Sequence, residues 1–207
     1  MRQRGIRRAI KRSLDVGFAG AGLCAAAPVI GATAAAVWAS MGRPVLFTQE
    51  RVGEGERVFR IYKFRSMRDP RDPSAPEPDH ERITRVGAFL RSTSLDELPQ
   101  LLNILKGDMS LVGPRPLLVR YIPRYDARQR RRHEVLPGLT GWAQVNGRNA
   151  SSWEEKFEND VWYVEHWSLA LDVRILARTV LTVVKRDGVS AEAHVTMPEF
   201  MGSPTPA

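Results

Sequence analysis

The sequence predicts an α+β fold that is mostly helical, with an N-terminal membrane helix, one β-hairpin and a helical domain that carries amphipathic helices at a membrane surface. Three observations lead to this prediction. Residues 16–42 contain no charged side chain, two β-rich runs flank a glycine-containing turn near residue 54, and residues 168–186 repeat apolar positions at helical spacing. We expect residues 1–42 to form the membrane part and residues 43–202 the folded domain.

The charge-free run lies between two basic segments. As a straight helix it would reach roughly 40 Å at about 1.5 Å per residue, enough to cross a hydrocarbon core. Cations at both ends favour a cytoplasmic position for both ends, and Pro28 interrupts the backbone hydrogen bonds near the middle. We therefore expect a re-entrant helix, broken at Ala27-Pro28, that enters one leaflet and returns. A single spanning helix with a proline kink is the alternative.

The composition limits which kinds of partner and which cellular compartment we expect. A formal net charge of +8 implies a polyanionic partner, either an anionic membrane face or nucleic acid. Cys24 is the only cysteine, which excludes a disulfide framework and a cysteine-based zinc site within one chain. A reducing, cytosol-facing location follows as the default. Residues 203–207 are expected to be a disordered tail.

The hairpin is predicted from residues 45–48 and 58–67, which are rich in β-formers and are separated by a turn at residues 53–55. Strand alternation places Lys63 and Arg65 on one face. Two neighbouring cations there could clamp a diphosphate. A solvated edge that carries charge against aggregation is the structural alternative.

Four further segments complete the chain. Residues 69–81 hold four prolines among acidic residues and should form a surface loop. Residues 117–132 alternate apolar residues with arginines, which is typical of a membrane-surface segment, a nucleic-acid contact or a solvated basic helix. Residues 137–141 are dense in Gly and Pro and predict a loop. Residues 168–186 predict an amphipathic helix that either packs on the core or dips into the membrane interface.

Adjacent carboxylates at Asp96 and Glu97 open an apolar-periodic segment. Ser94 or Asp96 is expected to be the helix N-cap, and Pro99 in the first turn favours Asp96. A helix N-terminus would hold Asp96 ionised and attract a phosphate. A Ser-x-x-Glu capping box is the purely structural alternative. The surrounding cations favour a site that handles anions: Arg91, Lys106 and Arg115.

Residues 94–116 (SLDELPQLLNILKGDMSLVGPRP) resemble the signature of the bacterial sugar transferases, the monotopic polyprenyl-phosphate phosphoglycosyl transferases. The likeness covers nearly the whole chain, and further matching stretches are residues 47–51, 62–67, 137–149 and 188–202. Within the family, residues 153–156 and 194–196 are similar to the small enzymes that load N,N'-diacetylbacillosamine phosphate onto undecaprenyl phosphate.

The resemblance implies transfer of a sugar 1-phosphate from a UDP-sugar to undecaprenyl phosphate, with release of UMP, as the first membrane step of glycoconjugate and polysaccharide assembly. It implies a catalytic domain on the cytoplasmic face of the bacterial inner membrane. Asp96 is expected to attack the sugar-bearing phosphate and form a covalent aspartyl intermediate. Mg²⁺, with Asp96 as a ligand, would relieve the repulsion between a carboxylate and a diphosphate. Glu97 would support the metal or manage protons.

The same resemblance assigns substrate contacts. Arg91 is expected to bind the acceptor phosphate, and Lys63, Arg65 and Arg115 the donor. Donor groups that the loop at 137–141 would deliver are further binding candidates: Gln144, Asn146 and Arg148. Anionic inner-leaflet lipids are expected partners and nucleic acid is not, while homo-oligomers are left open. One alternative is the same reaction with UDP-glucose or UDP-galactose. The other is a non-catalytic, membrane-tethered basic binding protein, which gives no reason for the Asp96-Glu97 pair.

Overall fold

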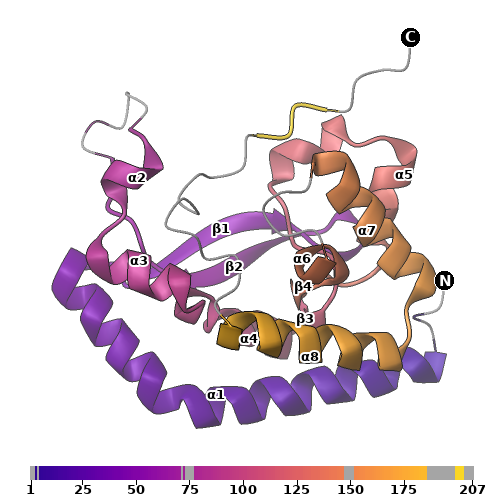
Figure 1. Cartoon of the computed structure of the whole chain (residues 1–207), viewed down its shortest axis with the longest axis horizontal. Coiled ribbons are helices and arrows are strands. Elements are labelled where there is room, and N and C mark those ends of the chain that lie inside the picture. The colour runs from indigo at the N-terminus through magenta and orange to yellow at the C-terminus, as the bar shows by residue number, and fades with distance from the viewer. Residues whose placement is uncertain are drawn as a thin grey trace.

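The computed structural model describes residue 3 and residues 5–70, 72, 77–146, 152–185 and 199–202. Its elements run in chain order as α1 Gly5–Met41, β1 Leu46–Val52, η1 Glu54–Glu56, β2 Val58–Phe64, α2 Asp79–Arg82, α3 Arg85–Ser92, η2 Leu95–Glu97, α4 Gln100–Lys106, β3 Ser110–Val112, η3 Val119–Arg124, α5 Ala127–Arg130, η4 Arg131–Glu134, β4 Gly138–Thr140, α6 Trp142–Asn146, α7 Trp153–His166 and α8 Leu169–Lys185. The prediction of a mostly helical α+β fold is confirmed. Helix α1 lies along one side of the molecule, with α3, α4 and α8 next to it (Figure 1).

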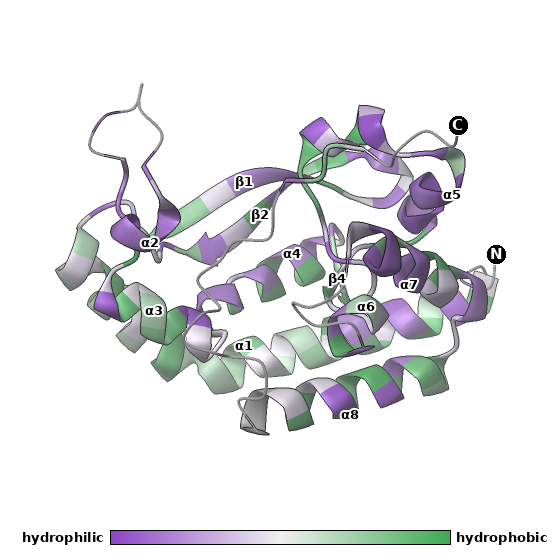
Figure 2. Cartoon of the chain, turned by 45° about the horizontal axis from the view of Figure 1, so that its top comes forward, coloured by the Kyte–Doolittle hydropathy of each residue, from purple (hydrophilic) through white to green (hydrophobic). Residues whose placement is uncertain are grey.

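Helix α1 is long, apolar and bent. It continues through Pro28, so the expected break is a bend within one helix (Figure 1), as a missing N–H and a crowded preceding turn would produce. Among the described residues it is the one helix long and apolar enough to cross a membrane. Phe18 and Trp38 are 61% and 60% exposed, and pale to deep green stretches cover much of the helix in Figure 2. Helix α1 thus presents an apolar outer surface.

Polar side chains near the start of α1 fasten it to the rest of the chain. Lys11 is buried and its Nζ lies 2.6 Å from Asp172 Oδ2 of α8. Arg12 donates to two carbonyl oxygens in the last turn of α4, at 2.5 and 2.9 Å. The carboxylate of Asp15 accepts the backbone N–H of Leu111 at 3.0 Å. The basic residues at 11 and 12, which precede the charge-free run, therefore contact the protein itself.

The predicted β-hairpin is confirmed. Strands β1 and β2 pair antiparallel, with Phe47 opposite Lys63 and Arg51 opposite Phe59. The turn uses Gly55 at φ 61°, in the left-handed region that glycine adopts without strain. Strand β2 ends at Phe64, and Arg65 is the next residue; its backbone N–H donates to the carbonyl oxygen of Val45 at 2.9 Å.

The acidic pair lies in the 3-10 turn η2 and not at the start of a longer helix. Ser94 has φ 56°, and its side chain makes no capping hydrogen bond. Helix α4 begins only at Gln100, with Pro99 as its N-cap. The prediction that Ser94 or Asp96 caps the helix is wrong. Proline, which lacks an N–H and has φ preset for a helix, occupies the cap position itself.

The expected loop at residues 137–141 is wrong in part, because its centre forms strand β4. Ser110 pairs with Gly138 and Val112 with Thr140 in a parallel ladder. A Cβ on Gly138 would lie 2.1 Å from the backbone N of Gly113. These glycines allow two backbones to approach closely, whereas the sequence pattern suggested a turn.

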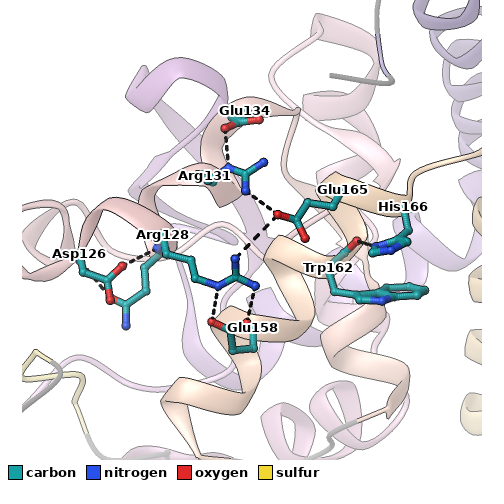
Figure 3. Close-up of polar contacts among 9 residues, drawn as sticks. Asp126, Arg128, Arg131, Glu134, Glu158, Trp162, Glu165 and His166 are labelled. Carbon is teal, nitrogen blue, oxygen red and sulfur yellow. Dashed lines mark hydrogen bonds and ion pairs between the residues drawn. The ribbon is translucent and has the colours of Figure 1, made fainter.

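The basic segment 117–132 forms short turns whose arginines pair with acids of the same chain. Arg128 Nε lies 2.7 Å from Glu158 Oε1 of α7, and Arg131 bridges Glu134 at 3.1 Å and Glu165 at 2.5 Å (Figure 3). These arginines thus have carboxylate partners within the protein. The prediction of an amphipathic helix at 168–186 is confirmed by α8, which buries one apolar row and exposes another: Leu171 and Ile175 inside, Val173 and Val180 outside.

Candidate active site

A broad, open cavity of about 1740 Å³ lies between the hairpin, α3, η2 and α8. Its described lining carries seven cationic and four acidic side chains, an excess of three positive charges. The cations are Arg51, Lys63, Arg65, Arg82, Arg91, Arg115 and Arg120, and the acids are Asp69, Asp79, Asp96 and Glu97. Such an excess in a concave site attracts a polyanionic ligand.

Asp96 is 9% exposed, and among the described residues its carboxylate has no hydrogen-bond or ion-pair partner. Burial, and then the charge of Glu97, raise the pKa of Asp96 to about 6, although Lys63 and Arg115 act in the opposite direction. The acidic pair does not open α4, so the helix N-terminus that was expected to stabilise the charge of Asp96 is not there. At pH 7 most of the group is still ionised, but its charge is poorly stabilised.

Glu97 is tightly paired. Its Oε1 lies 2.6 Å from Lys63 Nζ and 2.9 Å from Arg115 Nη2. Burial alone would raise the pKa of Glu97, but Arg115 and Lys63 together lower it to about 2. A carboxylate with so low a pKa is a weak base at neutral pH. The geometry therefore favours a role for Glu97 in holding two cations beside Asp96.

The backbone of Arg115 is itself fixed by a buried ion pair. Arg132 Nη2 donates to the carbonyl oxygen of Arg115 at 2.7 Å and to Asp160 Oδ2 at 2.7 Å. Arg132 and Asp160 are 2% and 4% exposed. The sequence analysis missed this pair because Arg132 stands in a run of arginines with nothing to distinguish it.

Two further predicted contacts line the same cavity. Arg91 comes from α3 and lies close enough to Asp96 for its charge to lower the pKa of that carboxyl. Arg65 also lines the cavity, but its Nη2 lies 2.9 Å from Asp69 Oδ2. Since Asp69 is largely exposed, Arg65 could exchange this partner for a phosphate at small cost.

The three binding candidates that follow residues 137–141 do not all lie at the cavity. Gln144 lines the cavity and donates to the carbonyl oxygen of Leu139 at 3.2 Å. Asn146 is not among the described residues of the lining, and its Oδ1 accepts Arg178 Nη1 at 2.7 Å. Arg148 lies outside the described residues. Of the three, the described structure brings only Gln144 to the cavity.

Strand β1 contributes two polar residues that the sequence analysis did not assign. Gln49 and Arg51 line the cavity on the same strand face as Phe47, and Arg51 Nη2 donates to Gln49 Oε1 at 2.6 Å. The sequence could have indicated this pair, because residues two apart on a strand share a face.

The residues present fit a magnesium ion that is bound by one carboxylate together with substrate phosphates and water. No group of three or more His, Cys, Asp or Glu side chains gathers in the part of the chain that the structure describes. Mg²⁺ is commonly bound by one or two carboxylates together with substrate phosphates and water. Asp96 supplies a carboxylate with no other partner in the described part of the chain, whereas Glu97 Oε1 already faces two cations.

Comparison with known proteins gives a consistent result. Residues 6–186 match the family model described as Bacterial sugar transferase. The chain is 52% identical to the uncharacterized sugar transferase EpsL of Bacillus subtilis, over 94% of this chain and 96% of that protein. It is 40% identical to the UDP-N-acetylgalactosamine-undecaprenyl-phosphate N-acetylgalactosaminephosphotransferase of Aeromonas hydrophila, over 84% of this chain and 44% of that protein.

A similar match is found to the UDP-glucose:undecaprenyl-phosphate glucose-1-phosphate transferase of Escherichia coli, with 41% identity over 85% of this chain and 40% of that protein. The chain thus spans nearly all of the Bacillus subtilis relative but less than half of the other two. The matched residues run from the start of α1 to the end of α8 and include the whole cavity. The chain belongs to the bacterial sugar transferase family.

Proposed function

We propose that the chain transfers a sugar 1-phosphate from a UDP-sugar to undecaprenyl phosphate, giving undecaprenyl-diphospho-sugar and UMP, as the first membrane step of glycoconjugate assembly. The observation that supports this most is Asp96, a buried carboxylate without a partner among the described residues, in a cavity with excess positive charge. The names of the relatives from Aeromonas hydrophila and Escherichia coli, which mention UDP-sugars and undecaprenyl phosphate, support the substrate classes.

Two displacements at one phosphorus complete the reaction. In the first, a carboxylate oxygen of Asp96 forms a bond to the sugar-bearing phosphorus while the P–O bond to UMP breaks, and UMP leaves with the electron pair. In the second, an oxygen of undecaprenyl phosphate attacks the same phosphorus and the Asp96 carboxylate leaves. Both nucleophiles are anionic oxygens, so neither step needs a base to remove a proton. This agrees with the low pKa of Glu97.

The charges around Asp96 suit these steps. Lys63 and Arg115, held by Glu97, would bind the phosphate oxygens of the donor, and Arg91 those of the acceptor. Asp96 would hold Mg²⁺ together with substrate oxygens, and the ion would supply charge neutralisation between carboxylate and phosphate.

The bent helix α1 supports a monotopic, re-entrant attachment to the cytoplasmic face of the bacterial inner membrane. Helices α1 and α8 lie side by side, joined by the Lys11–Asp172 ion pair, and both carry exposed apolar side chains (Figure 2). This surface would hold the cavity at the bilayer, where the lipid acceptor resides. Tags at the two ends of the chain should then be accessible from the same side, and accessibility from opposite sides would contradict the proposal.

A panel of UDP-sugars, scored by UMP release, tests the reaction and identifies the donor. The panel includes UDP-N,N'-diacetylbacillosamine, UDP-N-acetylgalactosamine, UDP-glucose and UDP-galactose, each with and without undecaprenyl phosphate. We expect one donor to release UMP in an amount matching the protein without acceptor, and catalytically with it. Asp96→Asn should release none. Full activity of that variant, or no release from any donor, would contradict the proposal.

A further inference from the structure

Arg51 makes no ion pair with any carboxylate of the described residues. Its Nη2 donates to Gln49 Oε1 at 2.6 Å, and its Nη1 lies 3.4 Å from the carbonyl oxygen of Pro116. Its Nε is buried and has no hydrogen-bond partner among the described residues. Within the described ranges no carboxylate lies at ion-pair distance from this guanidinium. A buried donor left unbonded costs free energy, which an acceptor atom of a bound ligand would offset.

The surroundings of Arg51 make the missing group an anion. Burial, and then the positive charge of Arg115, lower the pKa of Arg51 to about 10. Tyr121 and Glu97 act in the opposite direction, and Arg120 adds a smaller repulsive charge from η3. Two guanidiniums that repel each other in a half-buried cavity are stabilised when a phosphate binds between them.

The position of Arg51 relative to Asp96 indicates which phosphate this is. Arg115 contacts Glu97, and Arg51 Nη1 lies 3.4 Å from the carbonyl oxygen of Pro116, the residue after Arg115, so Arg51 is joined to the acidic pair through this segment. Along β1, Arg51 is four residues from Phe47, which faces Lys63 at the other end of the site. Four residues of strand span about 13 Å. Arg51 therefore lies about 13 Å along the hairpin from the position of Lys63, which contacts Glu97 next to the nucleophile.

We infer that Arg51, together with Arg115, binds the phosphate of the departing UMP. The inference rests on the proposed function. When Asp96 attacks the sugar-bearing phosphorus, negative charge develops on the adjacent UMP phosphate as the bridging P–O bond breaks. Two guanidiniums aimed at that phosphate stabilise the charge and bind the product. Arg51 then acts in the first displacement and has no part in the second, because UMP has left before the lipid phosphate attacks.

The test uses Arg51→Gln, Arg51→Lys and the matched control Arg57→Gln. Arg57 is an exposed arginine of the same hairpin that is not among the described lining residues. Two quantities are measured on the purified full chain: the equilibrium affinity for UMP alone, and kcat/KM for donor and for acceptor. We expect Arg51→Gln to weaken UMP binding and lower kcat/KM for the donor by about tenfold or more. Its kcat/KM for the acceptor should be unchanged. Arg51→Lys should retain part of both, and Arg57→Gln should match the wild type.

Several outcomes would overturn the inference. One is unchanged UMP affinity in Arg51→Gln. Another is an equal loss of kcat/KM for donor and acceptor, which a merely structural role would produce. A third is an equal loss in Arg57→Gln. UMP binding needs no covalent step, so its loss in Arg51→Gln would support the inference even if donor and acceptor reacted in a ternary complex. If Arg51→Gln fails to fold, the same measurements are made on Arg51→Lys, which keeps the charge and should show a smaller loss of UMP affinity and of kcat/KM for the donor.

Discussion

Replacing Asp96 by asparagine should stabilise the folded protein at neutral pH while abolishing activity. The pKa of Asp96 is about 6 in the folded chain, against an ordinary value of 3.8. The folded state therefore holds this proton more tightly than the unfolded chain does, and ionisation weakens the fold. At about 1.4 kcal/mol for each pH unit, the difference corresponds to up to about 3 kcal/mol at pH 7.

The sign of the effect fixes its pH dependence. The loss of stability caused by ionised Asp96 is fully present above pH 6, where the folded group is ionised, and it vanishes below the unfolded pKa of 3.8. Asparagine carries no such cost, so its advantage should be largest at pH 7 and should disappear near pH 4. Glu97→Gln is the matched control. The pKa of Glu97 is lowered to about 2, so its charge stabilises the fold and its loss should destabilise the protein at pH 7.

Thermal unfolding in detergent, followed by tryptophan fluorescence, measures the difference. For a chain of this size, 1 kcal/mol shifts Tm by about 2–4 °C, so Asp96→Asn should raise Tm by up to about 6–12 °C at pH 7. The gain should shrink steadily as the pH falls to 4. A variant that melts at or below the wild-type temperature at pH 7, or whose gain does not change with pH, would refute the reasoning.

Three further predictions concern the same structure. Without acceptor, the rate of UMP release should fall about tenfold for each pH unit below about 6, because Asp96 must be ionised to attack; a flat rate down to pH 5 would contradict this. Asp160→Asn leaves Arg132 buried without its counter-charge, so it should lower the free energy of unfolding by about 3–5 kcal/mol. It should also raise KM for the donor, since Arg132 holds the backbone carbonyl of Arg115, which we propose binds the donor. Lys11→Met should destabilise the protein by a similar amount, because Asp172 keeps its hydrogen bonds from Tyr163 and Trp167 but loses its counter-charge; adding Asp172→Asn removes that buried charge and should recover part of the loss. Equal Tm values for the single and double variants would speak against that pairing.

The elements that were predictable from sequence are those with a repeated pattern. Helix α8 follows from apolar residues at helical spacing, and the hairpin follows from two β-rich runs around Gly55. The length of the apolar run in α1 was equally predictable. Its shape was not, because Pro28 can end a helix or bend it, and contacts far along the chain decide between the two.

The candidate site was predictable in its residue types but not in its electrostatics. The pair at 96 and 97, with cations nearby, was visible in the sequence. The opposite pKa shifts of the two carboxyls were not visible, since they depend on the burial of Asp96 and on Lys63 and Arg115 both contacting Glu97. Nor could the sequence show that Gly138 lies against another backbone, because glycine is common in turns and close contacts alike.

Mass spectrometry of the protein incubated with its UDP-sugar donor alone tests the proposed chemistry most directly. After acid quenching and proteolysis, the peptide that contains Asp96 should carry the added mass of one sugar phosphate, in an amount equal to the UMP released. Addition of undecaprenyl phosphate should remove that mass, and Asp96→Asn should never acquire it. UMP release that requires the acceptor, with an unmodified Asp96 peptide throughout, would contradict the covalent mechanism.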